Sequence, residues 1–246
     1  TVVCPDLRGY GWSAAPHGDG GVATYTKRGM GEDIVAAMQA LGHLRFGVIG
    51  HDRGARVSYR LALDHPGRVE RLALVDILPT VSMWEGGEAS RAMRAYHWTF
   101  LAQPEPVPEE ALKPDPIGWL DRHEANWSRA NELGLFDPLA LRSYTESFGD
   151  PSRFHAACED YRAGATTDLA QDRADLAGGR RILCPTLALW AEAGHLNTGK
   201  SPLEIWHETF APTAEGQCLA GGHFLPEESP QAVLAALKSF LAQPLA

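Results

Sequence analysis

The pentapeptide Gly50–Gly54, GHDRG, places the carboxylate of Asp52 between two glycines, directly after an apolar run at residues 46–49. This order predicts a sharp strand–turn–helix elbow, which exposes its central side chain at the carboxyl end of a strand. A carboxylate there can attack as an oxygen nucleophile and form an ester with its substrate. Displacement at a saturated carbon forms such an ester most directly, so carbon–halogen bonds and epoxides are the expected substrates.

Two more residues with catalytic chemistry follow the ends of later predicted strands. Asp76 ends the apolar stretch 72–75, and His223 lies in a glycine-rich turn ahead of the last predicted helix. Because reactive groups gather beyond the carboxyl ends of parallel strands, we expect Asp52, Asp76 and His223 to meet. The order nucleophile, acid, histidine makes His223 the base and Asp76 the acid that orients it. Glu192 also follows a strand and is the alternative for the acid.

Two arginines lie beside the predicted nucleophile, Arg53 as its neighbour and Arg56 on the first turn of the following helix. Both guanidinium groups can face the mouth of a pocket. A substrate carboxylate about 5 Å from Asp52 meets a repulsion of roughly 3 kcal/mol at an effective dielectric of 20, and each arginine at about 4 Å returns roughly 4 kcal/mol. The pair therefore predicts an anionic substrate, held by planar bidentate hydrogen bonds.

Short β-branched runs alternate with helical patterns along the chain, which is typical of a parallel sheet with crossover helices. The expected strands are residues 1–4, 46–49, 71–75 and 182–190, and the expected helices are residues 30–41, 55–64 and 231–241. The chain opens with an apolar run and has no initiator methionine, so we expect that N-terminal strands are missing. The sequence thus predicts an α/β fold with a mostly parallel sheet flanked by helices.

The sequence changes in texture from about residue 81 to residue 180. This stretch holds four tryptophans and several prolines, and it has no convincing strand. We interpret residues 81–180 as a helical cap, inserted into an α/β core that consists of residues 1–80 and 181–246.

Composition and charge limit the classes of function. The 246 residues are 44% hydrophobic, which is enough for one sizeable core with an inserted subdomain. The formal charge of −9 argues against nucleic acid and anionic membranes as partners, because such binding depends on Lys and Arg meeting phosphate. Four scattered cysteines without a CxxC pair predict neither a disulfide framework nor a zinc site, and no apolar run is long enough for a membrane span. We expect a cytoplasmic protein.

The segments that carry these residues resemble the fluoroacetate (haloacetate) dehalogenase family of α/β-hydrolases. They are GHDRGAR at residues 50–56, LVDILPT at 74–80, the dipeptide His97-Trp98 and the tripeptide GHF at 222–224. The similarity covers essentially the whole chain, and it departs from the family only at the start, where the His-Gly loop before the first strand is absent. The resemblance implies the α/β-hydrolase fold with an inserted helical cap.

The resemblance also implies a role for each candidate residue. These roles are nucleophile for Asp52, base for His223, orienting acid for Asp76, substrate carboxylate ligands for Arg53 and Arg56, and halide pocket for His97, Trp98 and Tyr161. It further implies a homodimer. The expected partners are a small haloacid and water, and the chemistry requires no metal or organic cofactor.

The predicted reaction is the hydrolytic dehalogenation of a haloacetate to glycolate and halide. Asp52 attacks the α-carbon, the halide leaves toward hydrogen-bond donors, and His223 then activates a water that attacks the aspartyl ester. Imidazole, indole and phenol groups are the neutral or weakly charged donors that can meet the charge growing on fluoride. Without the resemblance, Trp98 and Tyr161 are interpreted as core aromatics of the cap, and His97 as a buried core histidine.

Three alternatives remain. An epoxide hydrolase uses the same catalytic set and protonates its substrate with cap tyrosines, for which Tyr96, Tyr144 and Tyr161 are candidates. The arginine pair argues against it, because a neutral substrate gives two buried guanidinium groups nothing to bind. A haloalkane dehalogenase is less similar, since Arg53 stands where that resemblance expects Trp. A noncatalytic binding protein would use the arginines to sense a small carboxylate.

Overall fold

The computed structural model of the chain describes residues 1–18, 22–86, 93–194, 196 and 199–244. Within these residues, four parallel strands form one sheet in the order β1-β2-β3-β4. The strands are β1 (Phe46–His51), β2 (Val69–Val75), β3 (Thr186–Ala191) and β4 (Glu215–Leu219). Parallel neighbours need crossover connections, which helices supply on both faces of the sheet. The predicted fold class is confirmed.

The sheet separates two apolar cores, because successive side chains of a strand point to opposite faces. In β2, Leu72 and Leu74 pack into the first core, whereas Ala73 and Val75 pack into the second. The first core is closed by helices that include α1 (Lys27–Ala40), α2 (Asp52–Asp64) and α11 (Pro202–Glu208), and the second by α12 (Leu225–Glu228) and α13 (Pro230–Ala242). Burial on both faces explains why β2 reads as an apolar run.

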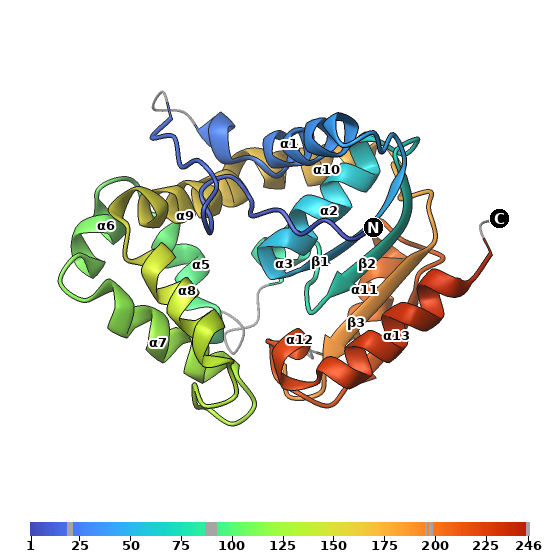
Figure 1. Cartoon of the computed structure of the whole chain (residues 1–246). Coiled ribbons are helices and arrows are strands. Elements are labelled where there is room, and N and C mark those ends of the chain that lie inside the picture. The colour runs from blue at the N-terminus through green and yellow to red at the C-terminus, as the bar shows by residue number, and fades with distance from the viewer. Residues whose placement is uncertain (19–21, 87–92, 195, 197–198, 245–246) are drawn as a thin grey trace.

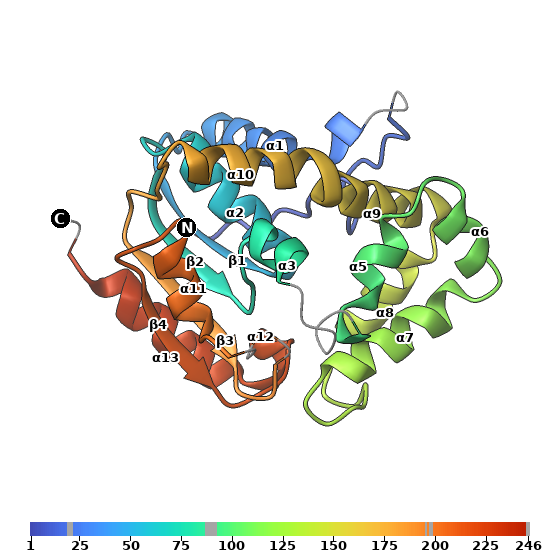
Figure 2. The same ribbon diagram turned by 180° about the vertical axis from the view of Figure 1, so that it is seen from behind.

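Helices fill most of the long connection between β2 and β3. They are α3 (Thr80–Glu85), α5 (Tyr96–Leu101), α6 (Val107–Leu112), α7 (Pro116–Trp127), α8 (Pro138–Phe148), α9 (Pro151–Ala163) and α10 (Leu169–Ala177). Figures 1 and 2 show α5 to α9 gathered beside the sheet. Helix α10 instead places Leu169 in the first core. The division into a core and a cap at residues 81 and 180 stays a prediction.

Two short helices of other types complete the chain's described elements. The 3-10 helix η1 (Val22–Tyr25) precedes α1, and the π-helix η2 (Gly164–Asp168) joins α9 to α10. A π-helical turn inside a helical stretch often marks a functional region, because it turns side chains away from the regular helical spacing. Here it directs Asp168 toward Lys27 of α1, at 3.1 Å from the carboxylate to the ammonium group.

The predicted strand at residues 1–4 is wrong. These residues form no strand and line an apolar groove of about 750 Å³ beside β1, because a strand requires the backbone of a neighbour to bond with. The strand predicted from residue 182 begins only at Thr186, after Pro185, whose nitrogen has no hydrogen to donate. Strand β4 was not predicted, since its residues 215–218 are exposed and form no apolar run. The other predicted strands and helices are confirmed within a few residues.

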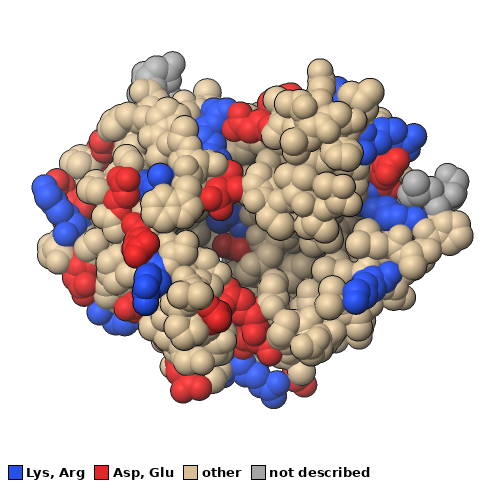
Figure 3. All heavy atoms as spheres, viewed as in Figure 1, with Lys and Arg blue, Asp and Glu red and all other residues tan. Residues whose placement is uncertain are grey.

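Three further observations concern membrane helices, surface charge and cysteines. None of the described helices is both long and apolar enough to cross a membrane. Figure 3 shows cationic and anionic side chains interspersed over one face of the molecule, with a hollow near its centre between the sheet side and the group α5 to α9. The four cysteines are unpaired.

Candidate active site

The elbow at the end of β1 forms as the sequence predicts. Strand β1 ends at His51, and helix α2 begins at Asp52, whose φ of 44° lies in the left-handed region. Gly50 allows the sharp turn, because a Cβ at this position would lie 2.5 Å from the Cα of Ala55 and from the Oγ of Ser58. Strand and helix can therefore approach closely only with glycine here, and the strained turn leaves the Asp52 side chain 36% exposed.

Asp76 and His223 meet beyond the ends of the strands. The Asp76 carboxylate is buried and lies 2.8 Å from Nδ1 of His223, while its other oxygen accepts a hydrogen bond of 2.9 Å from the backbone N–H of Ala191. Asp76 also has a positive φ, 50°, which turns its side chain away from the line of β2. The carboxylate thus fixes the imidazole with Nδ1 toward Asp76 and leaves Nε2 for the nucleophile side.

Nε2 of His223 lies 3.9 Å from the Asp52 carboxylate. Burial would lower the pKa of His223, but the Asp52 and Asp76 carboxylates outweigh it and raise the pKa to about 9. Burial would raise the pKa of Asp52, yet His223 and Arg53 hold it well below its usual range. At neutral pH the resting pair is therefore a carboxylate beside an imidazolium.

Two residues that the sequence did not single out hold the backbone of His223. Nε2 of His51 lies 2.8 Å from the His223 carbonyl oxygen, and the N–H of His223 donates to the carbonyl of Trp127 at 3.0 Å. The Trp127 ring also packs edge-on against the imidazole, with 4.9 Å between ring centres. His51 is part of the elbow peptide, so its place beside Asp52 was the available signal, whereas Trp127 lies on the distant helix α7.

Both arginines are buried, and they differ in whether a nearby carboxylate balances the charge of the guanidinium. The Nε of Arg53 donates to the Asp160 carboxylate at 2.6 Å. Arg56 donates to the Leu78 carbonyl at 3.1 Å and to the Thr80 hydroxyl at 3.4 Å. Among the described residues no carboxylate is within ion-pair distance of Arg56, and its Nε has no hydrogen-bond partner.

The predicted halide residues lie against the arginines. His97 and Trp98 are on α5 and Tyr161 is on α9, and the Tyr161 ring centre lies 5.6 Å from that of His97 and 5.8 Å from that of Trp98. The Arg53 guanidinium is 4.2 Å from the centre of the Tyr161 ring, and that of Arg56 is 4.3 Å from Trp98. These cation–π contacts bring the two predicted residue sets into one site.

Two further aromatic groups join this cluster without a sequence signal of their own. The Trp84 ring centre lies 5.5 Å from that of Trp98, and its buried indole N–H has no hydrogen-bond partner among the described residues. His123 lies 4.3 Å from His97 between ring centres, stacked between Trp119 and Trp127. Burial lowers the pKa of His123 to about 4, so it is neutral at pH 7.

The remaining candidates lie elsewhere. Glu192, the alternative acid, is 65% exposed and lies 3.9 Å from Arg129, whereas Asp76 contacts His223 directly. The Tyr96 side chain is 47% exposed and its hydroxyl lies 3.2 Å from the indole nitrogen of Trp119. Among the tyrosines considered for an epoxide hydrolase, Tyr161 is the one in contact with Arg53.

A separate cluster of side chains was not predicted. His17, Glu105 and His155 place one ligand atom each within 4.8 Å of one another. The two imidazole rings are stacked at 4.2 Å, however, so their in-plane lone pairs do not converge on one point. Nδ1 of His155 is 3.2 Å from Glu109, which also pairs with Arg162. We interpret this cluster as a stacked histidine pair among carboxylates.

The fold and the elbow place the chain in a known class of hydrolase. Residues 1–230 match the family model described as alpha/beta hydrolase fold. The chain is 39% identical over 242 residues to a fluoroacetate dehalogenase from Burkholderia sp, which covers 98% of this chain and 78% of that protein. The chain therefore belongs to the haloacetate dehalogenase family of the α/β-hydrolase superfamily.

Solved structures agree with the α/β-hydrolase fold of the chain. A protein from Nostoc sp PCC 7120, provisionally described as an α/β-hydrolase, superposes with a TM-score of 0.92 at 44% identity and covers 97% of this chain and 80% of its own. A Pseudomonas aeruginosa protein, provisionally described as an epoxide hydrolase, superposes with a TM-score of 0.89 at 42% identity and covers 96% and 78%. The predicted family resemblance is confirmed.

Proposed function

We propose that the chain hydrolyses haloacetates such as fluoroacetate and chloroacetate to glycolate and halide, through an ester on Asp52. The observation that carries the proposal is Arg56, a buried guanidinium with an unpartnered Nε and no carboxylate within ion-pair distance among the described residues. A buried charge left without a counter-ion is costly, so this geometry favours an anionic ligand as the missing partner. The nearby charge of Arg53 adds to the attraction for a small carboxylate.

In the first step, the substrate carboxylate binds the arginines, and an Asp52 oxygen attacks the α-carbon. A new oxygen–carbon bond forms as the carbon–halogen bond breaks and the halide leaves with the electron pair. Asp52 is ready for attack, because the imidazolium and Arg53 keep it ionised. The N–H and O–H groups of His97, Trp98 and Tyr161 receive the halide, and such preorganised donors are each worth a few kcal/mol in the transition state.

In the second step, water attacks the side-chain carbonyl carbon of Asp52, and His223 takes the water proton on Nε2. The bond between that carbon and the ester oxygen breaks, and glycolate departs with an oxygen that came from Asp52 and with the proton returned by Nε2. The water oxygen remains in the Asp52 carboxyl group, which loses the other water proton to solvent. Ester formation removes the Asp52 charge, one of the two that raise the pKa of His223, so before the water attacks, the imidazolium loses its proton to solvent more readily than in the resting site. Alkylation thus converts the resting ion partner into a base.

An epoxide hydrolase is the second candidate, and the described tyrosines favour it less. The Tyr144 hydroxyl donates to Glu227 at 2.7 Å, and the exposed Tyr96 lies near Trp119, so Tyr161 alone of the three candidate tyrosines lies beside the arginines. Arg56 would also oppose binding of a neutral epoxide, because its buried charge would remain without a counter-ion among the described residues.

A halide-release panel tests the proposal. Fluoroacetate, chloroacetate, a simple epoxide and an aryl ester are supplied in turn to the protein and to Asp52→Asn, which keeps the size of the side chain. We expect halide and glycolate from the two haloacetates with the unchanged protein, and a loss of at least about a thousandfold with Asp52→Asn. Epoxide opening without halide release would establish the second candidate instead.

A further inference from the structure

Arg53 and Arg56 differ in the partners of their guanidinium groups. Arg53 is paired with Asp160, which also accepts from Lys27 and from the Tyr10 hydroxyl. The described contacts of the Arg56 guanidinium are with a carbonyl and a hydroxyl, and neither carries a formal charge. Neutral acceptors fix the direction of a guanidinium without neutralising it, so Arg56 need not break an ion pair to bind an anion.

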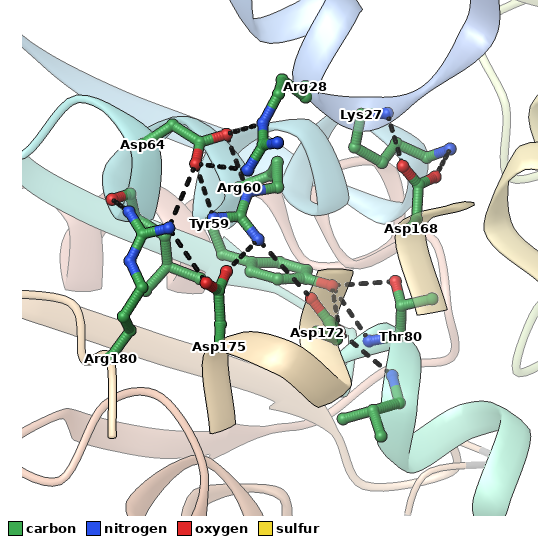
Figure 4. A network of polar contacts seen from close by, with 12 residues as sticks. Lys27, Arg28, Tyr59, Arg60, Asp64, Thr80, Asp168, Asp172, Asp175 and Arg180 are labelled. Atoms are coloured by element: carbon green, nitrogen blue, oxygen red, sulfur yellow. Dashed lines mark hydrogen bonds and ion pairs between the residues drawn. The ribbon is translucent and has the colours of Figure 1, made fainter. Parts of the chain in front are cut away.

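The hydroxyl beside Arg56 belongs to a chain of hydrogen-bonding groups. Oγ1 of Thr80 lies 2.8 Å from the Tyr59 hydroxyl, and that hydroxyl lies 2.8 Å from Oδ2 of Asp172. Figure 4 shows Tyr59, Thr80 and Asp172 converging from α2, α3 and α10. Tyr59, Thr80 and Asp172 are each 1% exposed, so water has little access to these hydrogen bonds.

The available protons fix the donor and acceptor of each hydrogen bond in this series. The Tyr59 hydroxyl has a single proton, and it accepts the backbone N–H of Thr80 at 3.1 Å. Burial raises the pKa of Asp172 to about 6, so at pH 7 it is ionised and accepts the hydrogen bond from the Tyr59 hydroxyl. The Thr80 hydroxyl then donates to Tyr59, and its lone pair is left for the N–H of Arg56.

We infer that Thr80, Tyr59 and Asp172 are positioning residues, which aim Arg56 at the substrate carboxylate through two hydroxyl groups and keep its charge unpaired. The inference rests on the proposed function and extends it to the origin of the preference for anionic substrates. A direct Asp–Arg56 pair would give the same orientation but would compete with the substrate for the guanidinium.

One short segment supports both halves of the site. The residues 76–80 that follow β2 carry Asp76, which orients His223, and also the Leu78 carbonyl and Thr80 hydroxyl, which hold Arg56. The N–H of Val81 donates to Asp172 at 3.1 Å, which anchors the start of α3 to α10. The segment 76–80 therefore sets the distance between the base, His223, and the proposed carboxylate ligand, Arg56.

Substitution of Thr80 tests the inference. Thr80→Val keeps the shape and removes the hydroxyl, and Thr80→Ser returns a hydroxyl. Thr186→Val is the matched control, because it removes another buried threonine hydroxyl, which donates to the Cys184 carbonyl at the amino end of β3. We expect Thr80→Val to raise KM for fluoroacetate roughly tenfold, since it loses a hydrogen bond to a charged group.

Two comparisons separate positioning from general damage to the fold. Partial unfolding lowers the active fraction and hence kcat, whereas misdirected Arg56 raises KM with kcat within about threefold. Thr80→Ser should return KM toward that of the unchanged protein, and Thr186→Val should leave it unchanged. If Thr80→Val does not fold, Tyr59→Phe tests the next link, with Tyr25→Phe as control because its hydroxyl bonds only to the Pro16 carbonyl among the described residues.

Binding without turnover completes the test. The Thr80 and Thr186 variants are combined with Asp52→Asn and titrated with fluoroacetate by calorimetry, and Thr80→Val should weaken binding by about the same factor as KM rises. An unchanged KM and affinity in Thr80→Val, or an equal change in Thr186→Val, would overturn the inference while wild-type turnover still upheld the proposed function. Absence of both halide release and fluoroacetate binding in the parent proteins would reject the proposed function itself.

Discussion

Arg53 and Arg56 lie three positions apart on one helix and yet are balanced in different ways. Burial opposes the charge of both, but Asp160 raises the pKa of Arg53 well above its usual value, whereas burial and the charge of Arg53 lower that of Arg56. The charge of Arg53 is therefore balanced within the protein. In the proposed mechanism, the charge of Arg56 stabilises a bound anion and lowers the stability of the fold without one.

Substitution of each arginine by methionine should change the free energy of unfolding, in opposite directions for the two residues. Arg56→Met removes an incompletely paired buried charge and should raise the free energy of unfolding by about 1 to 2 kcal/mol, while it abolishes haloacetate turnover. Arg53→Met leaves Asp160 short of a partner and should lower that free energy by about 3 kcal/mol. Urea unfolding at pH 7 measures both values, and changes of the same sign would contradict this account of the charges.

The resting state of His223 gives a second prediction at this scale. In the unchanged protein its pKa is raised to about 9, so the stability that it contributes is fully present below about pH 6.5 and is lost as the pH rises through 9. Asp52→Asn removes the carboxylate next to Nε2, as ester formation does, and should lower the pKa of His223. Titration of the imidazole protons by NMR in both proteins checks this, and equal midpoints would show that alkylation does not create the base.

At the scale of elements, the elbow depends on one glycine more than on the other. A Cβ at Gly50 would meet the backbone of Ala55 at 2.5 Å, which a rigid strand–helix contact cannot relieve, whereas no described atom lies within 4 Å of a Cβ at Gly54. The sequence placed Asp52 between two glycines and did not distinguish their roles. The structure assigns the steric requirement to Gly50.

The two glycines are therefore a matched pair for substitution. Gly50→Ala should lower the free energy of unfolding by about 2 to 3 kcal/mol through overpacking. Gly54→Ala should raise it by about 0.5 to 1 kcal/mol, because alanine loses less backbone entropy in helix α2. Denaturant unfolding distinguishes them, and a mild effect of Gly50→Ala would mean that strand and helix can separate without cost.

The elements that carry a local pattern of apolar residues could be predicted from the sequence. The apolar runs of β1 and β2 predicted the strands, and the chain order then predicted that Asp52, Asp76 and His223 would meet. Strand β4 escaped prediction because a polar edge strand lacks an apolar run, and residues 1–4 were assigned to a strand because their apolar character does not reveal whether a neighbour is present.

The supporting network was beyond the reach of sequence for another reason. Asp160 lies 107 residues from Arg53, and Asp172 lies 113 residues from Tyr59. An aspartate on a helix is most often exposed, so its residue type alone gives no signal that it is buried against a cation. Only the packing of α9 and α10 against α2 reveals these partners.

At the scale of the molecule, a buried charge cluster ties the group of helices beside the sheet to the sheet side. Asp160 of α9 contacts both Arg53 of α2 and Lys27 of α1, and Lys27 also contacts Asp168 of the π-helix. Two cations and two anions balance one another within this cluster. Arg53, a proposed ligand of the substrate carboxylate, is one of these cations, although the whole chain carries a net charge of −9.

Loss of this balance should destabilise the junction in a way that a second substitution repairs. Lys27→Met leaves two carboxylates with one cation and should lower the free energy of unfolding by about 3 kcal/mol. Asp168→Asn, added to it, restores neutrality and keeps an oxygen that can accept the Lys27 backbone N–H, so the double variant should be more stable than Lys27→Met. A double-mutant cycle by urea unfolding measures the coupling, and simply additive losses would contradict it.

The most direct test of the central claim, an ester on Asp52, is a single turnover of fluoroacetate in heavy-oxygen water with enzyme in excess. If Asp52 attacks carbon and water then attacks the aspartyl ester, the label appears in the peptide that contains Asp52, and the glycolate of that first turnover is unlabelled. Label in the glycolate alone would mean that water attacks the substrate directly, and the covalent account would be wrong.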